Sequence, residues 1–142
     1  MAFVEKFSPV VWVTIGYVCV YYIFLVNVLR VKVGVAKSCR ANGMKFDRYL
    51  SVDPKLRAAD RVQLNTLEHM PTFLVLLWLY AAVVDVSDAA TLGWLYVLLR
   101  VVYPIFMGAS LKRNIPMRLL INTFAGYLIL AIMAGGIVYT ML

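Results

Sequence analysis

The chain has 142 residues, of which 63% are hydrophobic and only 15% charged, and its mean hydropathy is +0.84. Soluble proteins contain about 45–50% apolar residues even when glycine is counted, and a domain of about 150 residues buries only about 70% of its surface. The excess of apolar side chains must therefore face lipid, which excludes a soluble enzyme, a disordered tail and a disulfide scaffold. In such a chain the net charge of +7 reports first on membrane topology.

The first predicted span is the uncharged apolar run of residues 9–29. It matches the roughly 20 residues that a helix needs to cross a bilayer, and it is too long for a cleaved secretory signal. We therefore expect a retained transmembrane helix, with Arg30 as an interfacial anchor at its end. The polar segment 30–61 follows; it carries most of the net positive charge, and residues 41–43 (Ala-Asn-Gly) predict a turn within it.

The second helix is predicted to begin with Asp53 as its N-cap and Pro54 at its first position. It runs to about residue 84 and contains the second span, residues 66–84. Pro71 lies inside this helix and predicts a kink, because proline removes a backbone hydrogen bond.

Two further spans are predicted, at residues 89–109 and 117–142. Ser87 or Asp88, in the short acidic turn before the third span, can cap that helix. In the fourth span, the small residues at 131 and 135 allow close approach of another helix, from this chain or from another subunit.

The charges agree with this count of spans. The first and third connections (30–61 and 110–118) are basic, the second (85–88) is acidic, and the termini are nearly neutral. Basic loops stay in the cytosol, so both termini should lie away from it. The sequence thus predicts an all-α, integral membrane four-helix bundle, with residues 1–142 forming a single domain.

Two predicted helices carry polar side chains that are unusual inside a membrane, where each ionisable residue costs about 2.5–3.5 kcal/mol on insertion scales. Each set falls within a wedge of about 60° on its helix, given the rotation of about 100° per residue. The sets are Arg61, Asn65 and Glu68 on the second helix, and Tyr96, Arg100 and Tyr103 on the third.

Two interpretations of these polar sets are open. In the structural one, Glu68 pairs with Arg61 or Arg100, and Asn65 bonds a neighbouring helix, so that the residues only hold the bundle together. In the functional one, the surplus of arginine over glutamate binds a zwitterionic or anionic ligand. An uncompensated guanidinium is costly in a low dielectric, and arginine is well suited to bidentate carboxylate binding.

At residues 61–71 the segment RVQLNTLEHMP resembles the signature of the MAPEG superfamily, the membrane-associated proteins in eicosanoid and glutathione metabolism. Residues 100–103 (Arg-Val-Val-Tyr) resemble the Arg-Val-x-Tyr motif of the type-three branch of microsomal glutathione transferases. The resemblance implies a homotrimer with active sites between subunits, open to the cytosolic side and to the bilayer. It also implies the endoplasmic reticulum or another intracellular membrane.

The resemblance further implies that glutathione is a co-substrate, whose thiolate attacks a lipophilic electrophile or a lipid hydroperoxide in a transferase or peroxidase reaction. Either Arg113 or Arg118, near the start of the fourth helix, would stabilise the thiolate, and the turn at Pro116 leaves both alignments open. The residues implied to contact glutathione are Arg30, Arg61, Asn65, Glu68, Arg100 and Tyr103.

Two positions depart from the pattern of efficient members of the superfamily. Met107 stands where those members often have a second tyrosine, and His69 stands where some have tyrosine; His69 reads as a structural interfacial residue. Met107 and the open choice between Arg113 and Arg118 favour an alternative, a non-catalytic, lipid-binding member or an accessory subunit of a membrane assembly. A small channel or transporter subunit is a third hypothesis. Membrane lipid is an expected partner. Nucleic acid is not, because topology explains the basic residues, and one histidine without a Cys/His cluster predicts no metal.

Overall fold

The computed structural model of the chain describes residues 2–47, 51–108 and 116–142. Over these residues the protein is all-helical, and each of its four helices is long and apolar enough to cross a membrane. The helices are α1 (Ala2–Ala41), α2 (Pro54–Val83), α3 (Val86–Met107) and α4 (Met117–Met141). The prediction of an all-α, four-span membrane bundle is confirmed, and the protein is an integral multi-pass membrane protein.

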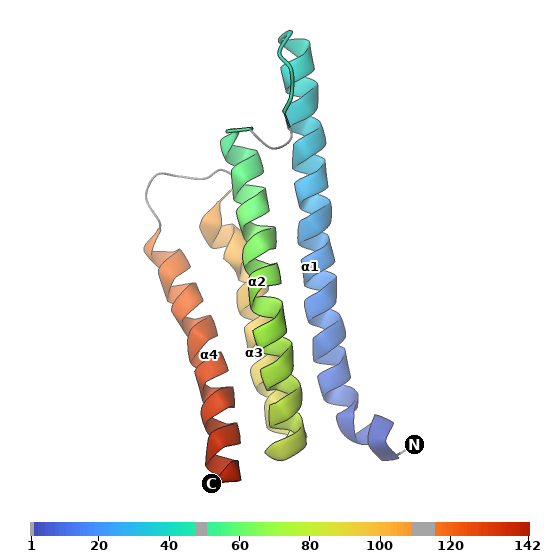
Figure 1. Cartoon of the computed structure of the whole chain (residues 1–142), viewed down its shortest axis with the longest axis vertical. Helices are drawn as coiled ribbons and strands as arrows, with labels where there is room; N and C mark the ends of the chain where they lie inside the picture. The colour runs from blue at the N-terminus through green and yellow to red at the C-terminus, as the bar shows by residue number, and fades with distance from the viewer. Residues whose placement is uncertain (1, 48–50, 109–115) are drawn as a thin grey trace.

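Helices α2 and α3 form the centre of the bundle (Figure 1). Each outer helix, α1 or α4, packs against both of them, whereas α1 and α4 do not contact each other over the described residues. Both chain ends lie at one end of the bundle, and the end of α1 and the start of α4 lie at the other (Figure 1). The four-helix arrangement therefore places the basic last part of α1 and the start of α4, with Arg118, at the end opposite the termini.

Helix α1 is longer than the predicted span. It continues past residue 29 to Ala41, so its 40 residues measure about 60 Å, against about 30 Å for a hydrocarbon core. The apolar run predicted the length of the membrane span. It did not predict the length of the helix, because the basic residues after the run continue the helix. The helix stops at the predicted turn, where Gly43 has a φ of +68° that glycine adopts without strain. Arg30, expected to terminate the helix, lies well inside it.

Aspartate caps set the starts of α2 and α3. The Asp53 carboxylate accepts hydrogen bonds from two backbone N–H groups of the first turn of α2, at 2.8 and 3.1 Å, as predicted. Helix α2 then continues through Pro71 without a break. Helix α3 begins earlier than predicted, because Asp85, and not Ser87 or Asp88, is its N-cap and accepts from the Asp88 backbone N–H at 2.9 Å. The N–H groups of the first turn lack partners within the helix, and a carboxylate placed just before them satisfies one.

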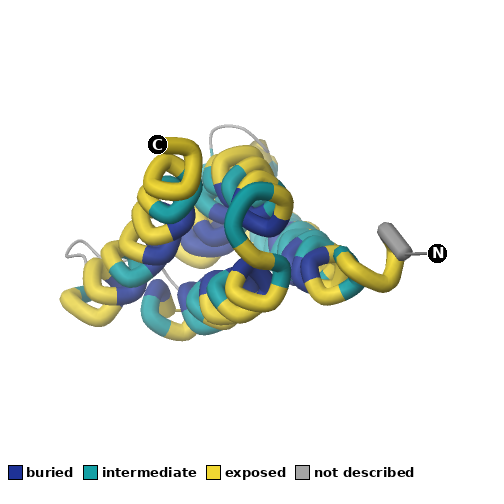
Figure 2. Tube along the Cα trace, turned by 90° about the horizontal axis from the view of Figure 1, so that it is seen from below, coloured by how far each residue is buried: buried dark blue, intermediate teal, exposed yellow. Residues whose placement is uncertain are grey.

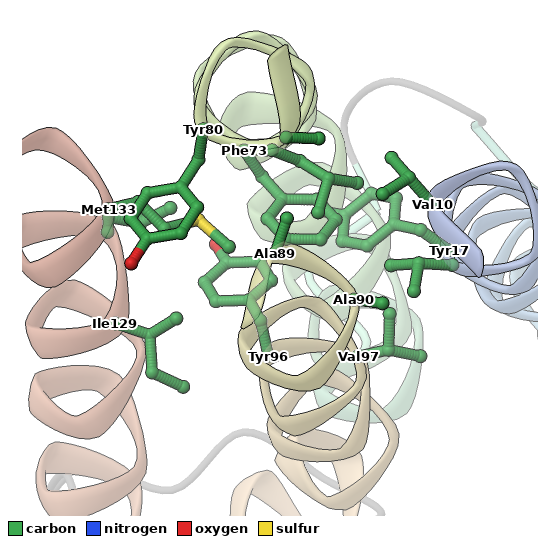
Figure 3. Close-up of a cluster of buried hydrophobic side chains, with 14 of the residues drawn as sticks. Val10, Tyr17, Phe73, Tyr80, Ala89, Ala90, Tyr96, Val97, Ile129 and Met133 are labelled. Atoms are coloured by element: carbon green, nitrogen blue, oxygen red, sulfur yellow. The ribbon is translucent and has the colours of Figure 1, made fainter. Parts of the chain in front are cut away.

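Buried residues face the interior of the bundle, and the outer faces of the helices are largely exposed (Figure 2). Many exposed side chains are large and apolar; Trp12, Ile105 and Phe124, for example, are 61%, 73% and 70% exposed. Such faces are unfavourable in water and favourable in lipid. The interior is an aromatic and aliphatic cluster to which all four helices contribute (Figure 3).

The small residues of α4 divide between two surfaces. A Cβ at Gly136 would lie 2.6 Å from Cε2 of Tyr80, so this glycine allows α4 to approach α2 closely. Ala131 and Gly135 are exposed, and a Cβ at Gly135 would meet no atom within 4 Å. The predicted close approach within the chain thus occurs at Gly136, and the Ala131 and Gly135 pair faces outward.

Candidate functional site

Arg100 is the charged residue buried most deeply among those described, with 4% of its surface exposed. Its Nη1 donates to Oδ1 of Asn65 at 2.6 Å, and its Nη2 donates to the Tyr96 hydroxyl at 2.6 Å. The guanidinium carbon also lies 4.9 Å from the centroid of the Tyr96 ring. All these partners are neutral, and no described carboxylate lies within 4.0 Å of the guanidinium. Burial of a cation without a counterion is costly, so this arrangement favours an incoming anion.

A stack of aromatic rings holds Arg100 in place. The Tyr96 ring is 4.3 Å from the Phe73 ring and nearly parallel to it, and the Phe73 ring is 4.9 Å from that of Tyr17 (Figure 3). All three rings are fully buried, and the Tyr17 hydroxyl donates to the Thr66 carbonyl at 2.7 Å. Aromatic pairs of this kind contribute about 0.5–1.5 kcal/mol each beyond area burial. Helices α1, α2 and α3 therefore form a fixed wall behind the guanidinium.

Helix α4 approaches Arg100 from another side. A Cβ at Gly126 would lie 3.7 Å from Nη2 of Arg100. One turn earlier, Asn122 is buried and donates from Nδ2 to the Leu99 carbonyl at 3.2 Å. Its Oδ1 is buried and has no hydrogen-bond partner among the described residues. The sequence reasoning did not assign Asn122 to a site. The sequence does contain an indication of this role, because a lone amide side chain inside an apolar span needs a hydrogen-bond partner.

The remaining residues of the two predicted sets lie about one helical turn from Asn65 or Arg100 on the same two helices. Tyr103 is buried in an apolar group with Val62 and Leu119. Arg61 and Glu68 are exposed, and Glu68 has no ion pair among the described residues. The structural interpretation made two predictions. The bond from Asn65 to a neighbouring helix is confirmed, and the pairing of Glu68 with an arginine is wrong for the described residues. We call Arg61, Asn65, Glu68, Tyr96, Arg100 and Tyr103 the polar cluster.

Arg30 does not join the polar cluster within one chain. It is exposed and lines a groove of about 1000 Å³ between α1, the start of α2 and the end of α3, which no residue of the polar cluster lines. Arg118 is exposed in the first turn of α4, next to Leu119, which packs in the same buried group as Tyr103. Arg113 lies outside the described residues.

The two departures from the superfamily pattern also lie near the cluster. Met107 is buried and packs in the apolar group that contains Tyr103. His69 is partly buried, with its ring centroid 5.2 Å from that of Tyr127 on α4. Neither side chain has a hydrogen bond within the described part of the chain. Met107 therefore supplies apolar surface at a position where a tyrosine would supply a hydroxyl.

Chemically, the polar cluster offers two guanidinium groups, a carboxylate, a carboxamide and two phenols, all from the two central helices α2 and α3. Such a set suits a zwitterion with an excess of negative charge, because arginines bind carboxylates and the single glutamate can accept from an ammonium group. The exposed positions of Arg61 and Glu68 make these two charges accessible from outside the chain.

Comparison with known proteins agrees with this arrangement of helices and motifs. A stretch of 85 residues is 36% identical to the uncharacterized protein sll1147 of Synechocystis sp., and it covers 58% of this chain and 55% of that relative. The chain thus spans little more than half the length of the curated relative that it matches. The sequence profile of the MAPEG family matches residues 10–139, which include both polar sets and all or most of each of the four spans. The chain therefore belongs to the MAPEG family.

Proposed function

We propose that this protein is a membrane-bound glutathione transferase that also reduces hydroperoxides with glutathione. The observation that carries the proposal is the buried guanidinium of Arg100, whose partners in the described chain are all neutral. Glutathione has two carboxylates and one ammonium group. Arg100 and Arg61 would bind carboxylate, and Glu68 would bind the ammonium, so the cluster matches the ligand in the sign and the excess of its charges.

The chemistry requires a thiolate. A thiol is mostly protonated at neutral pH, and a nearby guanidinium favours its ionised form; each unit of lowered pKa corresponds to about 1.4 kcal/mol. Either Arg113 or Arg118 would supply that guanidinium. In conjugation, the sulfur forms a bond to an electrophilic carbon while the leaving group departs with its electron pair. In the peroxidase reaction, two glutathione molecules become a disulfide while a hydroperoxide becomes an alcohol and water.

The proposal includes an assembly. Arg30 lies in the groove and apart from the polar cluster, so it could contact the same glutathione only if a neighbouring copy presented it. A homotrimer with sites between subunits would do so, with the basic end facing the cytosol, where glutathione is abundant, in the endoplasmic reticulum or another intracellular membrane. The apolar outer faces would admit lipophilic substrates from the bilayer.

Calorimetric titration of glutathione into the purified protein tests the proposal. Glu68→Gln is the sharpest variant, because Glu68 is exposed and makes no ion pair among the described residues, so the fold should not depend on its charge. Arg100→Lys keeps the positive charge and removes the two guanidinium nitrogens that donate to Asn65 and Tyr96. A lost charge-assisted hydrogen bond of about 1.5–3 kcal/mol raises Kd roughly 10- to 150-fold. Glu5→Gln, in the exposed first turn of α1, is the matched charge control for Glu68→Gln and should leave Kd unchanged.

Turnover is measured in parallel with a lipophilic aryl halide and an organic hydroperoxide. Wild-type affinity and turnover in both Glu68→Gln and Arg100→Lys would overturn the proposal. Glutathione binding without turnover would instead select an accessory or regulatory member, for which Met107 in the place of a tyrosine is the supporting feature. Absence of glutathione binding would select a lipid-binding member.

A further inference from the structure

A second groove lies at the end of the bundle that carries both chain termini. It is formed by the first turns of α1 and by the connection from α2 to α3. Its volume of about 560 Å³ is within the range of about 300–1000 Å³ that is usual for ligand pockets. No residue of the polar cluster lines it. We call it the terminal groove.

A proline and several small side chains create this hollow. Pro9 lies inside α1 and has no N–H for a helical hydrogen bond, and the first turns of α1 bend away from the bundle (Figure 1). A Cβ at Gly16 would lie 2.8 Å from two atoms of the Trp94 ring, so this ring packs directly on α1 and closes the deep end of the groove. The walls that α2 and α3 contribute include three alanines, at positions 81, 82 and 90.

The terminal groove has the depth of one leaflet of a bilayer. Helices α1 and α3 run in the same direction (Figure 1), and Val13 packs against Gly93. About seven residues before this contact, the two helices reach Lys6 and Val86, so Lys6 is level with the start of α3. Lys6 also precedes the uncharged run of α1 and therefore lies at the level of the headgroups. Trp94 is about 12 Å deeper at 1.5 Å per residue, within the roughly 15 Å of half a hydrocarbon core.

Opposite charges line the mouth of the terminal groove without pairing. Among the described residues, its charged lining residues are Lys6 and Asp85; both are exposed, and neither has an ion-pair partner within 4.0 Å. Oδ1 of Asp85 accepts from the Asp88 backbone N–H at 2.9 Å, and the other carboxylate oxygen makes no hydrogen bond in the described chain. The Ser87 hydroxyl, which also lines the groove, has no described partner either. A cation and a carboxylate held apart in one groove suit a ligand that carries both charges.

We propose that the terminal groove binds a zwitterionic glycerophospholipid with a primary ammonium headgroup, from the leaflet on the side of the chain termini. Its phosphate lies at Lys6 and Ser87, and its ammonium group donates to the free oxygen of Asp85. One acyl chain follows the alanine wall down to Trp94. The site is outside the polar cluster, so this proposal does not depend on glutathione chemistry.

Three other classes of ligand fit these groups less well. The quaternary ammonium group of a choline lipid has no N–H that could donate to Asp85. An anionic glycerophospholipid brings no cation and leaves the Asp85 carboxylate uncompensated beside its phosphate. A soluble phosphoethanolamine pairs with both charges but leaves the apolar wall uncovered.

Native mass spectrometry of the full chain in a neutral detergent tests the proposal. The protein is mixed with equal amounts of phosphatidylethanolamine, phosphatidylcholine and phosphatidylglycerol that carry the same acyl chains. An exposed ion pair changes affinity about 1.4- to 5-fold. We therefore expect one retained phosphatidylethanolamine per chain and a preference of about threefold or more over each competitor. Equal retention of the three lipids would overturn the proposal.

Asp85→Asn is the sharpest variant, because asparagine caps a helix about as well as aspartate but carries no charge. It should reduce the preference for phosphatidylethanolamine toward one. Asp88→Asn is the matched control, since it removes the same charge from an exposed side chain that does not line the groove, and it should leave the preference intact. Retained preference in Asp85→Asn, or equal loss in both variants, would contradict the proposed site.

Two further variants test the phosphate and the acyl chain. Lys6→Gln should lower the retention of all three lipids, since each has a phosphate, whereas Lys37→Gln near the other end of α1 should not. Ala82→Leu fills the groove from an exposed position without a change of charge and should also lower the retention of all three. Unchanged retention in both Lys6→Gln and Ala82→Leu would mean that the lipid binds elsewhere.

Three outcomes separate this site from its alternatives. Loss of an oligomer in Ala82→Leu, with lipid retention unchanged, would mean that a second copy of the chain covers the groove and would overturn the proposal. Displacement of the lipid by an equal amount of soluble phosphoethanolamine would overturn it too, because the apolar wall would then contribute nothing. Glutathione titration of Asp85→Asn keeps the two proposals apart: this variant should bind glutathione with wild-type affinity, because Asp85 lies outside the polar cluster.

Discussion

Substitution of Gly93 by alanine tests the packing at the point where α1, α2 and α3 meet. A Cβ at Gly93 would lie 2.7 Å from Cγ1 of Val13 and 2.9 Å from Cδ1 of Leu77, and both side chains are fully buried. Carbon atoms in contact are normally about 3.5–4.0 Å apart, so the methyl group would overlap two neighbouring helices by about 1 Å. Overpacking of a core costs about 1–3 kcal/mol, and alanine recovers about 0.5–1 kcal/mol of glycine's helical entropy cost. The two effects combine to a net loss of at most about 2.5 kcal/mol, with a middle value of about 1 kcal/mol.

Gly135→Ala is the matched control, because its new methyl group meets no atom within 4 Å; it should raise stability by about 0.5–1 kcal/mol. Both variants are compared by thermal unfolding in detergent, monitored by tryptophan fluorescence. In the double variant Val13→Ala with Gly93→Ala, the overlap is relieved, so the loss should be smaller than the sum of the two single losses. If Gly93→Ala proved as stable as Gly135→Ala, the close approach of the three helices at Gly93 would be wrong.

Three further variants test individual contacts by the same measurement. Tyr17→Phe removes the donor to the Thr66 carbonyl and should lower stability by about 0.5–1.5 kcal/mol; unchanged stability would show that this bond does not fix the α1 and α2 register. Asp53→Ala removes the α2 cap and should cost about 0.5–2 kcal/mol, whereas Asp53→Asn should keep most of that contribution. Asn122→Leu removes a buried oxygen that has no partner in the described part of the chain and should leave the melting temperature unchanged or higher, since an unsatisfied buried acceptor costs about 1–3 kcal/mol. A clear fall would mean that the Asn122 oxygen is satisfied in the membrane.

Apolar composition and charge predicted most of the fold. Four apolar stretches predicted four helices, because a chain in lipid must satisfy every backbone polar group within its own segments. The start of α2 at Asp53 and Pro54 was also predictable from the sequence, because a carboxylate cap acts over two or three residues. The start of α3 was not, since three polar residues of the acidic turn could each cap a helix, and packing decided that Asp85 does so. The length of α1 was underestimated because its basic extension is as good a helix former as its apolar part.

Of the candidate site, the sequence by itself determined which residues share a helix face, because the helical repeat fixes the angles between them. It placed Asn65 with Arg61, and Arg100 with Tyr96 and Tyr103. Only the tertiary structure decided what those faces meet. It joined Asn65 to Arg100 across two helices, left Glu68 without an ion pair among the described residues, and directed Arg30 into a separate groove.

The physical reason for this division is the range of the interactions. Hydropathy, capping and helical periodicity act over one helix or less, so they can be read from consecutive residues. The rotation of one helix against another depends on contacts such as the ring stack of Tyr17, Phe73 and Tyr96, which joins three helices that are distant in the sequence. That rotation decides which polar groups meet, as it does for Asn65 and Arg100.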